Sequence, residues 1–145
     1  AFVSIGYMGR SDARNRIYWR LKQAGFSLPV IQDPSAIVSG NAEIGEGTFI
    51  GKNVVVNADA YVGKMCILNT GAVIEHESRI GEFSHIAVGA VDVGYGTFIG
   101  AGTTVIQGIK IGSQSVIGAG TVVVKNIPDK TMVYGKILKE IRTGE

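Results

Sequence analysis

The chain has 145 residues, 46% of them hydrophobic, and a net charge of +2 at neutral pH. This length and composition suit a globular chain with one principal core. Its apolar runs are shorter than the roughly 18 residues that cross a bilayer, and no secretory signal opens the chain, so we expect a cytoplasmic protein without a membrane partner. A single cysteine, Cys66, excludes an internal disulfide framework.

Residues 1–33 differ in character from the rest of the chain. We expect a short strand at 2–6, a helix over 11–24 and another extended piece at 28–31. The expected inward positions of the helix, spaced by four and three residues, are Ile17, Leu21 and Ala24. This β–α–β order is that of the end of a small α/β unit. The sequence starts within an expected strand and without Met, so we expect it to be a truncated part of a longer protein.

The expected helix is strongly basic, with Asp12 as its acidic neighbour. Its basic residues are Arg10, Arg14, Arg16, Arg20 and Lys22. Two interpretations stay open: attraction for the phosphates of a nucleotide or coenzyme, and a solvated helix face. We do not expect nucleic acid as a partner, because the basic residues are confined to one short element without an aromatic stacking array.

Residues 34–128 repeat with a period of six. Fifteen positions, all Val, Ile or Leu, keep this spacing except for one residue of slippage at Asp92. These positions are Val38, Ile44, Ile50, Val56, Val62, Leu68, Ile74, Ile80, Ile86, Val93, Ile99, Val105, Ile111, Ile117 and Val123. Neither a helical period nor simple alternation explains a spacing of six, which is typical of stacked repeats. We therefore predict a mainly β solenoid, with three short strands and three corners in each of five triangular coils.

Small residues accompany the repeat. Thirteen of the fifteen residues four places after an aliphatic are Ala, Ser, Thr, Cys or Val, and eight of the fifteen that directly follow one are Gly. Glycine suits the point where a strand runs into a corner. Cys66 holds one of the small inward positions, so we expect it to pack rather than to act as a nucleophile.

The sequence thus divides into a partial α/β segment, 1–33, a repeat domain, 34–128, and a tail, 129–145. In the tail, Ile137, Leu138 and Ile141 are expected to form one apolar strip of a short helix that covers the last coil.

Both histidines of the chain lie within residues 68–91. His76 stands between Glu75 and Glu77 at a predicted corner, where it is accessible on rigid backbone. Histidine can accept a proton near neutral pH, and a carboxylate bonded to its other nitrogen would fix its tautomer. His85 ends its hexad, where the alternation points it outward from a strand. For either histidine a merely solvated surface side chain is the competing interpretation, and it is stronger for His85.

The six-residue pattern resembles the hexapeptide-repeat family, the left-handed parallel β-helix of many bacterial acyltransferases. The left hand is implied by the resemblance alone, because parallel crossovers are normally right-handed. The runs 69–77 (NTGAVIEHE), 80–86 (IGEFSHI) and 89–90 (GA) are similar to bacterial sugar O- and N-acetyltransferases. Those enzymes are typified by sialic acid O-acetyltransferase and the UDP-4-amino-sugar N-acetyltransferase of the bacillosamine pathway.

This resemblance implies an acetyl-CoA-dependent enzyme of glycan biosynthesis, with His76 as the general base and Glu77 supporting it. The residues it implies for the coenzyme are His85, Gly100, Ala101, Gly118 and Ala119, and for the acceptor Asn69, Thr70 and Glu75. It further implies a homotrimer with active sites between subunits and no metal.

Two features depart from the family pattern. Where members usually have a complete further hexad with a Gly pair, this chain has only Asp92 before its next aliphatic. Either a loop is missing there or the coenzyme pocket is altered. The Gly-rich first strand-to-helix turn is also absent, which puts nucleotide binding by residues 1–33 in question.

Acetyl transfer to the amine of a nucleotide-linked amino sugar is the leading functional hypothesis, and O-acetylation of the sialic acid type is the alternative acceptor chemistry. A zinc hydratase of the γ-carbonic anhydrase type shares the coil, but it needs three histidines around Zn²⁺ and the chain has two. The alternative that is not an enzyme is a structural or scaffolding solenoid.

Overall fold

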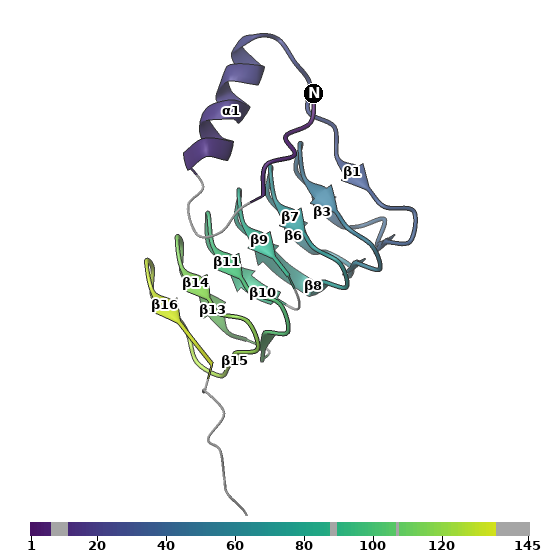
Figure 1. Cartoon of the computed structure of the whole chain (residues 1–145). Helices are drawn as coiled ribbons and strands as arrows, with labels where there is room; N and C mark the ends of the chain where they lie inside the picture. The colour runs from purple at the N-terminus through teal and green to yellow at the C-terminus, as the bar shows by residue number, and fades with distance from the viewer. Residues whose placement is uncertain (7–11, 88–89, 107, 136–145) are drawn as a thin grey trace, which may run out of the picture.

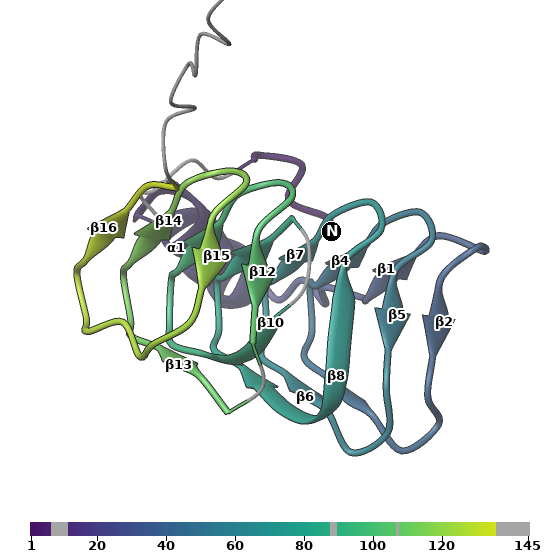
Figure 2. The same cartoon turned by 90° about the horizontal axis from the view of Figure 1, so that it is seen from below.

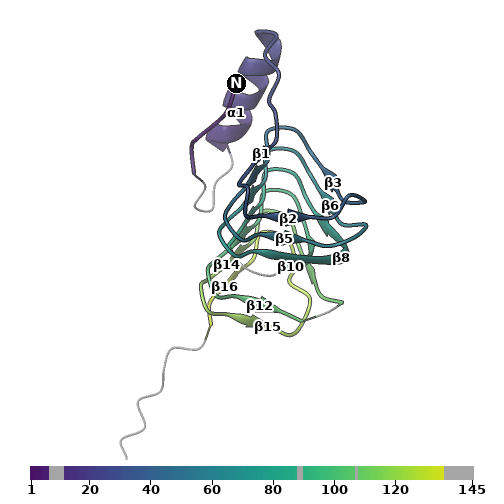
Figure 3. The ribbon, with the colours of Figure 1, turned by 90° about the vertical axis from the view of Figure 1, so that its right-hand side faces the viewer.

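The computed structural model describes residues 1–6, 12–87, 90–106 and 108–135. Within these ranges the chain forms one helix, α1 (Asp12–Gln23), followed by short strands that wind into a triangular coil (Figure 1). Seen along its axis, the coil shows three flat faces with α1 lying outside one apex (Figure 3).

The described strands pair in parallel with their equivalents in neighbouring coils, apart from one break on the second face. The first face comprises β1 (Ile31–Gln32), β4 (Phe49–Ile50), β7 (Ile67–Leu68), β9 (His85–Ile86), β11 (Phe98–Ile99), β14 (Val116–Ile117) and β16 (Met132–Val133). The second face comprises β2 (Ile37–Val38), β5 (Val55–Val56), the start of β8 (Val73–Ile80) and of β10 (Ala90–Val93), β12 (Thr104–Val105) and β15 (Val122–Val123) (Figure 2). Among the described strands of this face, β12 and β15 form a separate pair that is not bonded to β10. The third comprises β3 (Glu43–Ile44), β6 (Tyr61–Val62), the ends of β8 and β10, and β13 (Lys110–Ile111).

The aliphatic positions of the hexads fill the inside of the coil, as predicted. Those with no exposed surface are Ile50, Val62, Leu68, Ile74, Ile80, Ile86, Ile99 and Ile117. Burying such a side chain contributes roughly 1.5 to 3 kcal/mol before the cost of chain entropy. The small inward positions pack beside them, and their hydroxyls bond to carbonyls of the neighbouring coil, as where Thr97 Oγ1 donates to the Gly112 carbonyl at 2.7 Å.

The coil extends slightly beyond the predicted repeat. Strand β1 pairs with β4 and therefore belongs to the coil, although it begins at Ile31, within the segment assigned to the α/β unit. Strand β16 pairs with β14, so the tail starts with a further strand of the first face. The predicted helix of the tail, with Ile137, Leu138 and Ile141, lies outside the described residues.

The helix is confirmed, and of its predicted inward positions Ile17 and Leu21 pack against the core, whereas Ala24 does not. Arg14 and Tyr18 are buried, at 2% and 3% exposure, Ile17 and Leu21 are half-buried, and Ala24 is exposed. Four residues separate Arg14 from Tyr18, so both lie on the side that faces the coil. The helix packs through a cluster of Val3, Tyr18, Leu28, Met65 and Phe83, which we call the helix cluster.

The predicted strand over residues 2–6 is wrong. These residues run across the first face, where Phe2 contacts Phe49 and Val3 enters the helix cluster. A strand exists only where a neighbour takes up its backbone hydrogen bonds. In the described part of the chain, residues 2–6 are held by side-chain packing and not by pairing with a neighbouring strand.

Candidate functional site

His76 stands at the outside of a bend in β8, which continues through the corner between the second and third faces. Its side chain and those of Glu75 and Glu77 are exposed. Glu77 has a φ of 59°, the left-handed conformation that lets the strand turn, and its N–H donates to the Ala58 carbonyl at 3.1 Å. The imidazole is therefore carried on ordered backbone and points away from the core.

The two glutamates beside His76 have different surroundings. Glu75 Oε2 accepts a hydrogen bond of 3.2 Å from Asn57 Nδ2, in the coil below. Within the described part of the chain, neither carboxylate is hydrogen-bonded to the imidazole. The support of His76 by Glu77 therefore stays a prediction.

The slippage at Asp92 is a shortened coil that passes directly over His76. Ala90 pairs with Ile74 and Asp92 pairs with Arg79, so two residue steps of β10 replace five of β8. The next coil thus has no corner stacked on the His76 corner. Ser78 shows the consequence: its hydroxyl is buried yet has no hydrogen-bond partner among the described residues, because the neighbouring corner that would carry one is absent.

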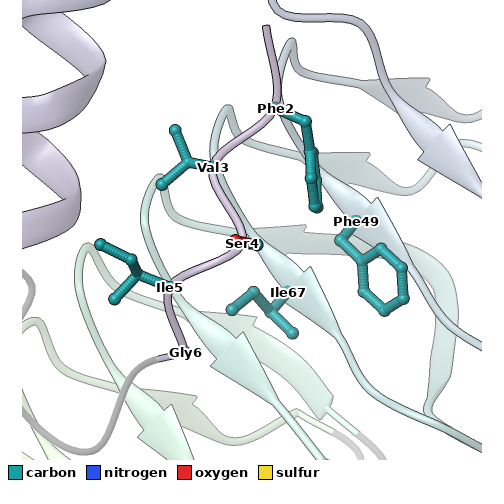
Figure 4. A pocket seen from close by; sticks show the side chains of 7 residues that line it. All are labelled: Phe2, Val3, Ser4, Ile5, Gly6, Phe49 and Ile67. Atoms are coloured by element: carbon teal, nitrogen blue, oxygen red, sulfur yellow. The ribbon is translucent and has the colours of Figure 1, made fainter.

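His85 lies on the first face, away from the His76 corner. In register with it are Ile67 on one side and Phe98 on the other, and its half-buried ring meets the Phe98 ring edge-on at 5.1 Å. An apolar hollow of about 190 Å³ adjoins this row, between residues 2–6 and the side chains of Phe49 and Ile67 (Figure 4). His85 therefore lies within an otherwise apolar row of the first face, between Ile67 and Phe98.

The other predicted coenzyme residues share one corner, between the first and second faces. Gly100 N–H donates to the Ile117 carbonyl at 2.9 Å and Ala101 accepts from the Gly120 N–H at 2.8 Å, which stacks the two coils tightly. A Cβ on Gly100 would lie 2.6 Å from the Ala119 nitrogen, so only glycine fits. Gly118 lies in the upper of these two coils, and the Ala101 and Ala119 side chains are exposed.

The predicted acceptor residues are divided between the two corners. Asn69 and Thr70 belong to the same corner as Gly100, and the Thr70 N–H donates to Asn69 Oδ1 at 2.9 Å. Glu75 belongs to the His76 corner. Asn69 and Thr70 thus lie on the same edge of the coil as Gly100 but two coils away from it, and His76 lies at the opposite edge of the second face.

Sequence reasoning missed a polar pocket on the third face, beside the His76 corner. Its volume is about 210 Å³ and its lining residues are Asn41, Glu43, Asp59, Ala60, Tyr61 and Arg79. The Arg79 guanidinium lies over the Tyr61 ring, 4.9 Å from its centre. The spacing of 18 residues could have found this pocket, because Asn41 and Asp59, and Glu43, Tyr61 and Arg79, are each one coil apart.

Two buried groups complete the chemistry of the chain. Burial raises the pKa of the Cys66 thiol to about 12, so it remains protonated near neutral pH, in keeping with the predicted packing role. Burial likewise lowers the pKa of Arg14, whose Nε and Nη1 have no hydrogen-bond partner among the described residues.

In the described ranges, no helix has the length and apolarity to cross a bilayer, and no three His, Cys, Asp or Glu side chains converge as metal ligands.

A triangular parallel coil with its polar groups at the corners defines a hexapeptide-repeat β-helix. The family described as the hexapeptide repeat of succinyl-transferase matches residues 41–81 and 90–125. The chain is 32% identical to the acetyltransferase domain of PglB from Neisseria gonorrhoeae FA1090, with a TM-score of 0.82 over 88% of this chain. It is 34% identical to a mutant perosamine N-acetyltransferase from Caulobacter crescentus in complex with CoA and GDP-perosamine, with a TM-score of 0.80 over 96%.

The chain therefore belongs to the hexapeptide-repeat family, is similar to sugar acetyltransferases, and has as its coil the left-handed β-helix expected from the sequence. WeeI from Acinetobacter baumannii AYE has the same fold, with 22% identity and a TM-score of 0.82 over 88% of this chain and 65% of that one. The chain spans 65% of the PglB structure and 69% of the Caulobacter structure.

Proposed function

We propose that the protein transfers an acetyl group from acetyl-CoA to the amine of a nucleotide-linked amino sugar, with His76 as the general base. The observation that carries this proposal is the accessible imidazole of His76 on the continuous backbone of β8. Relatives support the chemistry: the Caulobacter N-acetyltransferase is in complex with CoA and GDP-perosamine, and a PglB structure is in complex with acetyl coenzyme A.

In this reaction His76 takes a proton from the amine while the amine nitrogen attacks the thioester carbonyl. A backbone N–H stabilises the negative charge on the carbonyl oxygen of the tetrahedral intermediate. When the intermediate collapses, the carbon–sulfur bond breaks and the departing thiolate takes the proton from the imidazolium. The products are the N-acetylated sugar and CoA, and no acyl-enzyme forms.

The charges around His76 favour an amine over an anionic acceptor. Glu75 and Glu77 flank it, and Asp59 lies at the corner of the coil below. Carboxylates attract an amino sugar in its ammonium form and repel the carboxylate of a sialic acid. We therefore prefer N-acetylation to O-acetylation.

We further propose that the active site forms between copies of the chain, in a homotrimer. Within one chain, His76 and the corner of Gly100 lie at opposite edges of the second face. We therefore expect a neighbouring copy to bring its own Gly100 corner to His76. The second face is suited to such contact because it presents apolar side chains outward, with Ile37 67% and Val122 62% exposed.

The shortened coil is the feature that favours the scaffolding alternative, because the family's extra hexad adds to the coenzyme site. Purified protein should be titrated with acetyl-CoA by calorimetry and then assayed for thiol release with GDP-perosamine, a UDP-linked 4-amino sugar and sialic acid. We expect coenzyme binding, thiol release with an amino sugar and an amide product by mass spectrometry. An ester product on sialic acid would contradict the amine acceptor, and absence of coenzyme binding would support a scaffold.

A further inference from the structure

We infer that the polar pocket of the third face holds the sugar ring of the acceptor, and that Arg79 determines which sugars are accepted. This inference rests on the proposed acetyl transfer and names the part of the substrate that the pocket would recognise. The pocket of about 210 Å³ is smaller than the roughly 300 to 1,000 Å³ of sites that enclose whole drug-sized ligands. It therefore suits one ring rather than a whole nucleotide sugar.

The pocket begins one coil from the proposed base. The pairing of Tyr61 with Arg79, together with the hydrogen bond from Glu77 to the coil below, stacks the corner of Asp59 under that of Glu77. Paired strands lie about 4.8 Å apart, so Asp59 is about one strand spacing from the residue beside His76. Arg79 follows His76 by three residues on β8, which spans at most about 10 Å along the strand. A sugar with its amine at His76 can therefore reach the pocket with its ring.

The groups of the pocket match ring hydroxyls. Glu43 and Asp59 only accept hydrogen bonds, the Arg79 guanidinium only donates them, and Asn41 and Tyr61 do both. A sugar hydroxyl donates one hydrogen bond and accepts others, so adjacent hydroxyls can satisfy a carboxylate and the guanidinium together. Two carboxylates against one guanidinium leave the lining with a charge of −1, which disfavours the diphosphate of a nucleotide sugar.

Arg79 is held before any ligand arrives. Its guanidinium packs over the Tyr61 ring, and its backbone N–H donates to Asp92 Oδ1 at 3.3 Å. A cation–π contact of this kind restrains the long side chain while leaving its N–H groups directed at solvent. The conformational entropy of the Arg79 side chain is therefore already reduced before the sugar binds, so less binding free energy is lost on ordering it. This allows a single arginine to discriminate between sugars.

The test compares Arg79→Ala with Lys110→Ala, which removes a positive charge from the same face outside the pocket. Both are assayed with the amino-sugar nucleotide that wild type turns over fastest, and with its analogue lacking one ring hydroxyl. For Arg79→Ala we expect the acceptor KM to rise about 10- to 100-fold, with kcat and the acetyl-CoA KM unchanged. The preference for the hydroxylated acceptor should shrink in parallel, whereas Lys110→Ala should behave as wild type.

Two further variants separate charge from geometry. Arg79→Lys keeps the charge but not the planar fork and should give an intermediate acceptor KM. Tyr61→Leu removes the ring under the guanidinium and should raise the same KM more weakly than Arg79→Ala. An unchanged acceptor KM in Arg79→Ala, or a rise in the acetyl-CoA KM, overturns this inference and leaves acetyl transfer intact. Failure of wild type to release thiol with every acceptor overturns the proposed function, and this inference with it.

Discussion

The backbone N–H of Glu77 donates a hydrogen bond of 3.1 Å to the carbonyl of Ala58, one coil below. That bond secures the His76 corner from one side. On the other side Ala90 pairs with Ile74 and Asp92 with Arg79, so the next coil passes by without a corner of its own. The imidazole thus stands at a bend that is supported from below, where the repeat above it is interrupted.

His76→Ala should lower kcat by about 10² to 10⁴, the usual contribution of a general base. The melting temperature should not change, because the side chain is exposed and makes no hydrogen bond within the described chain. Lys125→Ala is the matched control, because Lys125 holds the same place in a later hexad. Thiol release and a melting curve measured on both variants check this, and retention of most activity by His76→Ala removes it from the role of base.

Mixing two inactive variants should restore activity if the active site lies between copies. His76→Ala lacks the base, and Ala101→Glu places a carboxylate at the glycine corner, where it would repel the coenzyme phosphates. After random equal mixing of subunits, roughly a quarter of the contacts unite an intact His76 corner with an intact glycine corner. We expect about that fraction of wild-type thiol release, with the oligomer size checked by sedimentation. Activity no greater than the sum of the separate variants would place the site within one chain.

Gly81→Ala should destabilise the coil by roughly 1 to 3 kcal/mol through overpacking. A Cβ at this position would lie 2.5 Å from the Gly94 carbon and from the Tyr95 nitrogen, both backbone atoms of the next coil. Gly40→Ala is the control, because a Cβ there meets nothing within 4 Å. Urea unfolding of the two variants measures the difference, and equal stability would contradict the close stacking at Gly81.

The buried thiol of Cys66 should make stability fall between about pH 9 and pH 12. Its pKa rises from 9.0 to about 12 on folding because burial disfavours the thiolate. In that window the unfolded chain has released the proton and the folded chain retains it, so the free energy of unfolding decreases with pH. The contribution of this group is fully present below about pH 9, and its decrease approaches about 1.4 kcal/mol per pH unit between pH 9 and pH 12. The decrease should vanish in Cys66→Ala. Unfolding at several pH values compares the variant with wild type, and identical slopes would show that the thiol is accessible.

Arg14→Met should leave the melting temperature unchanged or raise it. The guanidinium is buried, and two of its nitrogens have no hydrogen-bond partner in the part of the chain that the structure describes. An apolar side chain of similar length avoids the cost of burying that charge. Arg20→Met, on the exposed side of the helix, should have little effect. Differential scanning calorimetry measures both. A loss of about 3 kcal/mol or more in Arg14→Met would indicate that the charge is paired in the folded protein.

Much of the fold could be predicted because the repeat leaves few alternatives. An aliphatic side chain every six residues places one inward-facing residue on each of the three faces of an 18-residue coil. Small residues such as Thr97 and Ser115 fill the narrow inward positions beside them. The exposed position of His76 followed from its place in the hexad, two residues after Ile74. The neighbours of His76 did not follow, because they depend on how one coil stacks on the next.

The six-residue period alone determined the coil, its inward residues and the outward placement of His76, because these depend on spacing along the chain. The tertiary structure decided the surroundings of single side chains. Arg79 lies over Tyr61, Arg14 is buried on the side of the helix that faces the coil, and the Ser78 hydroxyl has no hydrogen-bond partner among the described residues. It also decided that residues 2–6 pack by side chains rather than pair as a strand. Arg79 and Tyr61 are 18 residues apart in the sequence, and Phe2 and Phe49 are 47 apart. Local preference does not encode such contacts, which arise only when the coils stack and the N-terminal residues close against them.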